Sequence, residues 1–234
     1  MKKEDKVIKV PGLKFFDSKP MEAWSMLQKF LNKKGNPPYI IKNNVYLNNL
    51  PVKTLNNLKT VNGDLLLKGT KIDDLGVLVY VEGNLDLRNT PIKSLGELYG
   101  VGKNLVLYNT PIQDLGKLKF VGGSVNSNRI DLRDLGNLEV VETDLDLYES
   151  KIEDFKNLLY VGGSLHANNC QNLKSFGKLK TVGGDLDISK TTIDNFGVIK
   201  HIKGDLLIKG SVINKMYSND QIKSMVKIDG VIFE

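Results

Sequence analysis

The chain has 234 residues, of which 41% are hydrophobic and 7% aromatic, and a net charge of +6. Its one cysteine, Cys170, excludes an internal disulfide, and no stretch reaches the roughly 20 apolar residues that a bilayer-spanning helix needs. The first residues, Met-Lys-Lys-Glu-Asp-Lys, precede no apolar run of the kind found in secretory signals. These features predict a cytoplasmic protein, of a bacterium or of an infected host cell, without a membrane partner.

Residues 1–40 form the first predicted unit, a basic segment followed by a capping helix. They hold nine lysines and four acidic residues, and therefore carry a net charge of +5. Val7–Val10 predict a short strand, and residues 18–34 predict an amphipathic helix with Ser18 as its N-cap. The apolar stripe of this helix is Met21, Trp24, Leu27 and Leu31. We expect Trp24 to pack on the first repeat; a partner-binding role for the helix is the alternative.

Residues 41–213 form the second unit, in which a pattern of 20 residues recurs nine times, with one extra residue in the seventh repeat. Each repeat begins with valine or isoleucine: Ile41, Val61, Val81, Val101, Val121, Val141, Val161, Val182 and Ile202. With Val61–Tyr80 as the type, apolar residues recur at positions 1, 5, 7, 12, 15 and 18. A fixed period of this length predicts a solenoid, in which each repeat buries its apolar face against its neighbours.

The other positions of the repeat predict its local structure. Positions 5 and 7 alternate with polar residues, which is typical of a strand with one buried face, and the spacing of positions 12, 15 and 18 suits a 3₁₀ or extended return path. Glycine at positions 3 and 16 indicates positive φ or close backbone approach. Ser, Thr, Asp or Asn at position 14 is expected to cap the amides of the next turn, and acidic or amide residues at position 4 indicate turn formation. Position 15 of the last repeat is Met216.

The pattern Leu65-x-Leu67-x-x-Thr70-x-Ile72-x-x-Leu75 resembles the leucine-rich repeat family, whose core reads L-x-L-x-x-N-x-L-x-x-L. The resemblance covers residues 41–213 and is closest to the short repeats of bacterial proteins. It implies an α/β-type solenoid with one parallel sheet on its concave face and a mostly irregular or 3₁₀ convex side. Hydroxyl residues such as Thr70 replace the family's ladder asparagine, and we expect them to bond neighbouring repeats.

Residues 214–234 form the last predicted unit, a C-terminal cap. Residues 218–226 predict a short helix and Val231–Phe233 a final strand. Both ends of a solenoid need such caps, because each end otherwise exposes an unpaired strand and half of the core.

The inner face of the predicted sheet displays positions 4, 6, 8 and 9. Tyrosine and arginine gather on it in the middle repeats, and these residue types carry much of the binding energy of protein interfaces. The candidate partner-binding residues are Asp86, Arg88, Tyr108, Asn128, Arg129, Asp146, Tyr148, His166 and Asn168. The alternative is a solvated sheet face, which needs polar side chains in any case.

Residues with catalytic or metal-binding chemistry are few, and each fits the repeat. His166 and Cys170 lie four residues apart, but a nucleophile pair also needs an orienting group and an oxyanion site. Two aspartate pairs, Asp144 with Asp146 and Asp185 with Asp187, have the spacing of calcium ligands but recur with the repeat. The glycine pairs lack the following Lys-Ser/Thr and helix of a phosphate-binding loop. We therefore expect no enzyme activity, no cofactor and no metal.

These observations favour a protein–protein interaction module, such as a bacterial or phage adaptor or inhibitor. One alternative is a structural part of a larger assembly such as a phage virion, docked through the basic N-terminal segment. Another is nucleic-acid binding through residues 1–40. Nucleic acid is the less favoured partner, because the repeats hold 21 basic and 20 acidic residues and are nearly neutral.

Overall fold

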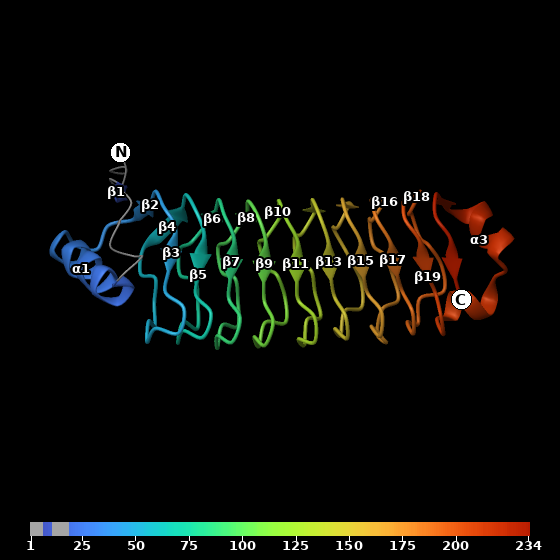
Figure 1. Cartoon of the computed structure of the whole chain (residues 1–234), viewed down its shortest axis with the longest axis horizontal. Helices are drawn as coiled ribbons and strands as arrows, with labels where there is room; N and C mark the ends of the chain where they lie inside the picture. Colours follow the sequence, from blue (N-terminus) through green and yellow to red (C-terminus); the bar gives the residue numbers. More distant parts are fainter. Residues whose placement is uncertain (1–6, 11–18) are drawn as a thin grey trace, which may run out of the picture.

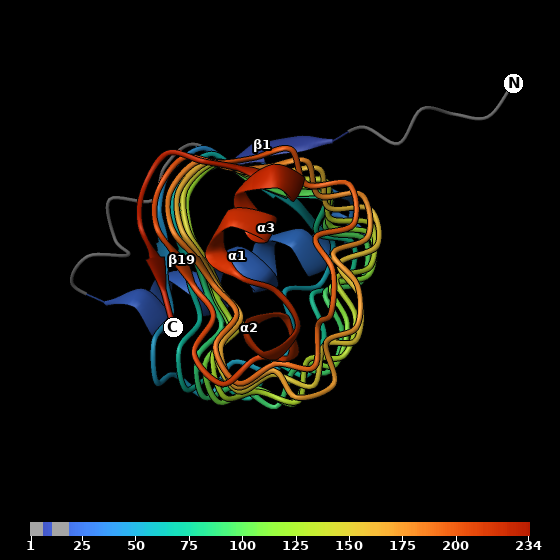
Figure 2. The ribbon, with the colours of Figure 1, turned by 90° about the vertical axis from the view of Figure 1, so that its right-hand side faces the viewer.

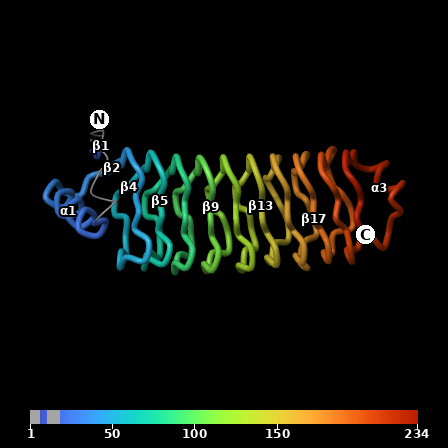
Figure 3. Tube along the Cα trace, in the orientation of Figure 1, coloured from blue at the N-terminus to red at the C-terminus, as the bar shows by residue number. Residues whose placement is uncertain are grey.

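The computed structural model describes residues 7–10 and 19–234, which form a parallel β-solenoid. Each repeat makes one coil, and the coils stack along a straight axis (Figure 1, Figure 3). Seen along this axis, successive coils overlie one another around a common interior (Figure 2). The solenoid predicted from the 20-residue period is therefore confirmed.

Two parallel sheets run the length of the described rod, one of eleven strands (sheet A) and one of ten (sheet B). Sheet A contains β1 (Ile8–Val10), β2 (Tyr39–Ile41), β4 (Leu58–Val61), β6 (Tyr80–Val81), β8 (Gly100–Val101), β10 (Phe120–Val121), β12 (Val140–Val141), β14 (Tyr160–Val161), β16 (Thr181–Val182), β18 (His201–Ile202) and β20 (Lys227–Ile228). Sheet B contains β3 (Val45–Tyr46), β5 (Leu65–Leu66), β7 (Leu85–Asp86), β9 (Leu105–Val106), β11 (Val125–Asn126), β13 (Leu145–Asp146), β15 (Leu165–His166), β17 (Leu186–Asp187), β19 (Leu206–Leu207) and β21 (Ile232–Phe233).

The second sheet corrects the predicted architecture, which had a single sheet; the rest of the return path, as in residues 67–79, is irregular as predicted. Tyr80 and Val81, at positions 20 and 1, pair with the next coil in the same parallel register as positions 5 and 6. Residues 7–10 and 19–234 contain no 3₁₀ helix. Because strands pair at the same spacing on both sides of each coil, the stack runs straight, and sheet B lies along a long side of the rod rather than on a concave face.

The core is a continuous column of the six predicted apolar positions, whose side chains are almost completely buried. In the later coils the column is aromatic at position 15, where the ring centroids of Phe155 and Phe176 lie 5.7 Å apart and those of Phe176 and Phe196 lie 6.4 Å apart. The prediction was wrong for Met216, which is 53% exposed because Val212–Met216 form helix α2 in place of a further coil.

The turn residues follow the predicted chemistry. At position 14, Asp74 Oδ1 accepts a hydrogen bond from Gly76 N at 2.6 Å, and corresponding bonds occur at six other coils. Glycine at position 16 has positive φ, as in Gly76 at 60°. Glycine at position 3 does not; it is required by close approach, since a Cβ on Gly63 would lie 2.4 Å from Asn44 Oδ1.

The continuous ladder that joins neighbouring coils runs through position 4; at position 10, Ser150 Oγ and Cys170 Sγ lie 3.3 Å apart across two coils. Thr90 and Thr110, at position 10, donate to carbonyls of their own coil, so the expected hydroxyl ladder is wrong for them. At position 4, each side chain instead accepts a bond from the backbone N–H of position 4 in the next coil, as Asn44 Oδ1 does from Asp64 N at 2.8 Å. The series continues to Asp205 Oδ1, which accepts from Val231 N.

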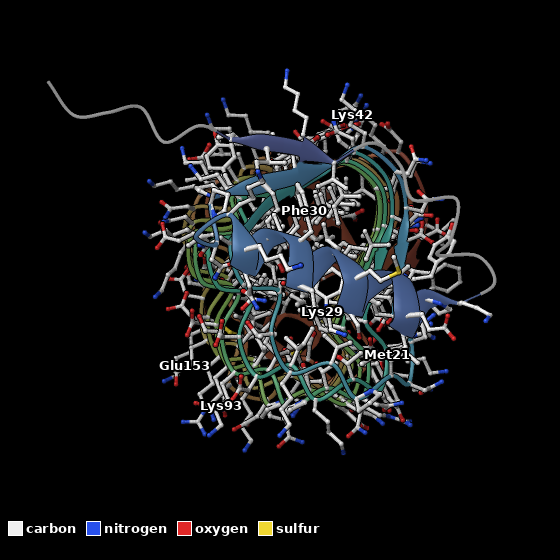
Figure 4. The ribbon with its side chains drawn as sticks, turned by 90° about the vertical axis from the view of Figure 1, so that its left-hand side faces the viewer. Met21, Lys29, Phe30, Lys42, Lys93 and Glu153 are labelled. Carbon is white, nitrogen blue, oxygen red and sulfur yellow. The ribbon has the colours of Figure 1, made fainter. Side chains whose placement is uncertain are left out.

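Helix α1 (Pro20–Lys33) lies across the N-terminal end of the rod (Figure 4). Trp24 is buried, together with Ala23, Leu27 and Leu31, and these side chains belong to the same apolar cluster as the core of the coils. Met21 was predicted in this stripe but is 37% exposed. The predicted N-cap Ser18 lies outside the described residues, and the predicted strand is observed as β1.

The C-terminal end carries α2 and helix α3 (Asn219–Met225). Ser218 begins α3 with a capping box, in which its side chain accepts from Gln221 N and its own N–H donates to Gln221 Oε1. The last strand, β21, pairs with β19, so the predicted helix and strand are both present. Among the described residues, no helix has the length and apolar character needed to cross a membrane.

Candidate protein-binding face

The candidate residues lie along sheet B, whose strands face the viewer in Figure 1: Asp86, Asp146 and His166 are in its strands, and the other six are in the turns that follow them. Positions 5 and 7 point into the core, so position 6 of each coil points outward. The parallel register places Asp146 between Asn126 and His166, one coil away on either side. Five coils therefore bring the candidate residues onto one surface, at about 4.8 Å per coil.

Asp86 and Arg88 form a fixed ion pair at one end of this surface. The Nε and Nη2 atoms of Arg88 donate to Oδ1 and Oδ2 of Asp86 at 2.9 and 2.6 Å, and Arg88 N donates to Oδ1 at 3.0 Å. Asp86 is only 7% exposed, so this carboxylate, predicted as displayed, serves to orient the arginine. The hydrogen bonds to Asp86 raise the pKa of Arg88 above its ordinary value.

Arg129, two coils further along, and Tyr148 and Glu149, three coils further along, form a second group. The guanidinium of Arg129 lies 5.4 Å from the centroid of the Tyr148 ring, and its Nε lies 3.4 Å from Glu149 Oε2. Arg129 and Glu149 occupy position 9, which has positive φ in each coil, with values of 55° and 58° here. The sequence did not predict this left-handed position, which is asparagine or glycine in several other coils.

Asp146 connects the second group to its neighbours. Its Oδ1 accepts from Tyr148 N at 3.0 Å, and its Oδ2 accepts from Asn128 Nδ2 at 2.9 Å. His166 and Asn168 lie one coil beyond and are half-buried, with no side-chain hydrogen bond to the described residues. Tyr108 lies between the two groups, and its side chain is 44% exposed.

Cys170 and Asp144, which were considered for catalysis and metal binding, are engaged in structural bonds. Cys170 is buried; its Sγ donates to Leu147 O at 3.1 Å and lies 3.3 Å from Ser150 Oγ, and burial raises the pKa of its thiol. His166 points outward from sheet B, so the two do not form a pair. Asp144 Oδ1 accepts from Ser164 N in the ladder. The described residues hold no group of three His, Cys, Asp or Glu side chains placed to hold a metal ion.

The outer face of sheet A is a surface that the sequence analysis missed, because it assigned no strand to position 20. Position 20 is Tyr80, Phe120 and Tyr160 in every second coil, and these residues lie in line along sheet A because its strands pair in register. A Cβ on Gly100 would lie 3.1 Å from two ring carbons of Tyr80, so this ring fills the space that the glycine leaves. The recurrence of tyrosine, phenylalanine and valine immediately before position 1 is the signal that could have identified the strand.

Comparison with protein-family models, with curated proteins and with solved structures gives no match.

Proposed function

We propose that the chain is a non-enzymatic, cytoplasmic interaction module that holds a protein partner on the outer face of sheet B. The observation that carries this proposal is the exposed ring of Tyr108 between two arginines that are already held in place, Arg88 by Asp86 and Arg129 by Tyr148 and Glu149. Arg88 and Tyr148 are three coils apart, about 14 Å, which is the scale of an interface centre.

The pre-organisation of the two arginine side chains supports a binding role for this face over the alternative of a solvated face without a partner. A long arginine side chain loses rotamer freedom when a partner immobilises it, and this loss weakens binding. Here the carboxylate of Asp86 and the ring of Tyr148 restrict the two guanidinium groups before any partner arrives. Tyrosine and arginine in such positions are the residue types most often found at the energetic centre of an interface.

Kinship with leucine-rich repeats and the capping role of α1 belong to the same proposal. The kinship is supported by the buried leucine and isoleucine positions of the repeat, although the two-sheet cross-section departs from what the resemblance implied. The capping role is supported by the burial of Trp24, Leu27 and Leu31 against the first coils.

A photoreactive residue in place of Tyr108 tests the proposal. We expect it to cross-link a defined protein in cell extract, whereas the same residue in place of Lys93 gives no such product. Lys93 is exposed at position 13, in the loops away from sheet B (Figure 4). The identified partner is then titrated against the Tyr108→Ala and Tyr148→Ala variants, and each change is expected to weaken binding about 30-fold.

The matched control is Lys93→Ala with Glu153→Ala, two exposed residues at position 13 that leave sheet B intact. Equal affinity of the tyrosine variants and the wild-type chain would contradict the proposal. Loss of the partner only on deletion of residues 1–16 would instead favour docking of an assembly, or of nucleic acid, through the basic segment.

A further inference from the structure

Helix α1 leaves an apolar strip exposed on the N-terminal end of the rod. Its inward side is buried, but Met26 is 71% exposed and Phe30, one helical turn later, is 48% exposed. Met21 adds a third exposed apolar side chain near the start of the helix. In the end-on view, α1 crosses the end of the rod, with Phe30 beside one edge of the helix (Figure 4).

Lysines that have no ion-pair partner among the described residues surround this strip. Five exposed lysines lie at this end, and none has a carboxylate within ion-pair distance among the described residues: Lys9, Lys29, Lys33, Lys34 and Lys42. The exposed acidic residue of α1, Glu22, lies 3.4 Å from Lys19. The end of the rod is therefore strongly positive, with apolar side chains among the charges.

The opposite end of the rod differs in charge. Residues 214–234 hold three lysines and three acidic residues, and Lys227 lies 3.2 Å from Asp229 there. On the sides, residues 41–213 hold 21 basic and 20 acidic residues, and some of these form ion pairs, as Lys117 does with Glu97 at 2.7 Å. The excess of positive charge is thus a property of one end of the molecule.

We propose that the N-terminal end face docks on an anionic lipid surface, with Met26 and Phe30 at the headgroup boundary and the lysines over the lipid phosphates and carboxylates. A helix that lies flat with apolar side chains beside lysines matches the physics of interfacial binding, in which apolar burial and electrostatic attraction add. Lysine is a flexible point charge that suits a diffuse negative surface. Nucleic acid, the other polyanion, offers no apolar layer for Met26 and Phe30.

The sequence predicted no membrane partner, because no stretch is long enough to span a bilayer; docking on the lipid surface needs no spanning helix. Because α1 crosses the end of the rod, docking through it directs the rod away from the bilayer and leaves both sheets accessible (Figure 1, Figure 4). The inference is independent of a protein partner on sheet B.

Sedimentation of the full-length chain with vesicles tests the proposal. We expect binding to vesicles of phosphatidylcholine mixed with phosphatidylserine, little binding to phosphatidylcholine alone, and release by salt. Lys29→Gln with Lys33→Gln should weaken binding about 5-fold per lysine. Met26→Ser with Phe30→Ser, which keeps every lysine, should weaken it about 10-fold.

The matched control lies on α3, where Lys223→Gln with Met225→Ser makes the same kind of change at the neutral end and should leave binding unchanged. Fluorescence of Trp24, the sole tryptophan, which lies on the buried side of α1, verifies that each variant remains folded. Absence of binding to the mixed vesicles overturns the proposal. Equal binding by the α1 variants and the wild-type chain also overturns it, because the contact would then lie in another part of the chain. Tighter binding to duplex DNA than to the vesicles overturns it as well.

Discussion

Oδ1 of Asp64 accepts a hydrogen bond from the backbone N–H of Asn84 in the next coil, at 2.8 Å. The residue before Asn84 is Gly83, and a Cβ there would lie 2.3 Å from the same oxygen. Position 3 is therefore glycine so that the position 4 side chain of the preceding coil can reach its partner. Two features of the repeat that look separate in the sequence form one contact.

Coils without glycine at position 3 support this relationship. Where Lys103 stands there, the bond from Asn104 N to Asn84 Oδ1 lengthens to 3.2 Å. Where Thr143 stands there, the acceptor is the short side chain of Ser124, and the bond from Asp144 N measures 3.4 Å. The ladder tolerates a side chain at position 3 only with a longer bond.

Gly83→Ala is expected to lower the free energy of unfolding by about 1–3 kcal/mol, since its Cβ would also lie 2.6 Å from Asp64 N, a backbone atom that cannot move aside. Urea denaturation followed by circular dichroism measures the change. Lys103→Ala, at the same position of the next coil, is the control and should change stability by no more than about 0.5 kcal/mol. Equal effects of the two substitutions would show that the glycine has no steric role.

Asp64→Ala removes the acceptor for two donors of Asn84, its backbone N and its Nδ2, at 2.8 and 2.9 Å. Because Asn84 is partly buried, we expect a loss of about 1–3 kcal/mol in the free energy of unfolding. Asp64→Asn keeps an acceptor oxygen and should restore most of the stability. Asp73→Ala, at an exposed residue whose side chain has no hydrogen bond to the part of the chain that the structure describes, is the control. A loss from Asp64→Asn as large as from alanine would exclude the ladder bond as the cause.

Tyr39→Phe tests the attachment of α1 to the first coil. The buried hydroxyl of Tyr39 donates to Leu55 O at 2.8 Å and accepts from Gln28 Nε2 of α1 at 3.2 Å. Its loss leaves a buried carbonyl without a partner, so we expect about 1–3 kcal/mol of destabilisation, measured from Trp24 emission during denaturation. Tyr99→Phe, which changes a ring that is 53% exposed, should leave the transition in place. Coincident transitions for the two variants would argue against the anchoring role.

The C-terminal end is expected to depend on pH through Asp229. Its carboxylate lies 2.7 Å from His201 Nε2 and 3.2 Å from Lys227 Nζ, and the hydrogen bonds from these two groups hold the pKa of Asp229 below its ordinary 3.8. A depressed pKa means that the carboxylate stabilises the fold above its ordinary pKa and loses this effect as the pH falls through the lowered value.

Asp229→Asn should therefore reduce hydrogen-exchange protection of the β20 amides at neutral pH. The difference from the wild-type chain should disappear in acid, once Asp229 is protonated. Glu153→Gln, an exposed change without a side-chain partner, is the control. A difference that persists unchanged at pH values well below 3.8 would exclude the carboxylate as its source.

The outer face of sheet B shows which parts of a candidate binding site can be predicted from the sequence. The alternation of positions 5 and 7 correctly predicted that position 6 is displayed, which placed Asp146 and His166 on one surface. It did not predict that Asp86 is nearly buried beneath Arg88, or that Asn128 bonds Asp146 of the next coil. These pairings depend on rotamers and on the offset between coils, which the order of residue types does not encode.

The sequence by itself determined the coil. The apolar period set which side chains are buried, and the cap residues at position 14 and the glycines at position 16 set the local turns, because these effects act within a few residues. Only the tertiary structure decided the second sheet, the straight axis, the ladder at position 4, and the face on which Phe30 joins exposed lysines. Each of these depends on contacts between backbones about 20 residues apart or on the packing of α1 against the first coil. A side-chain pattern states what must be buried, but the partner of each backbone N–H is decided when the coils stack.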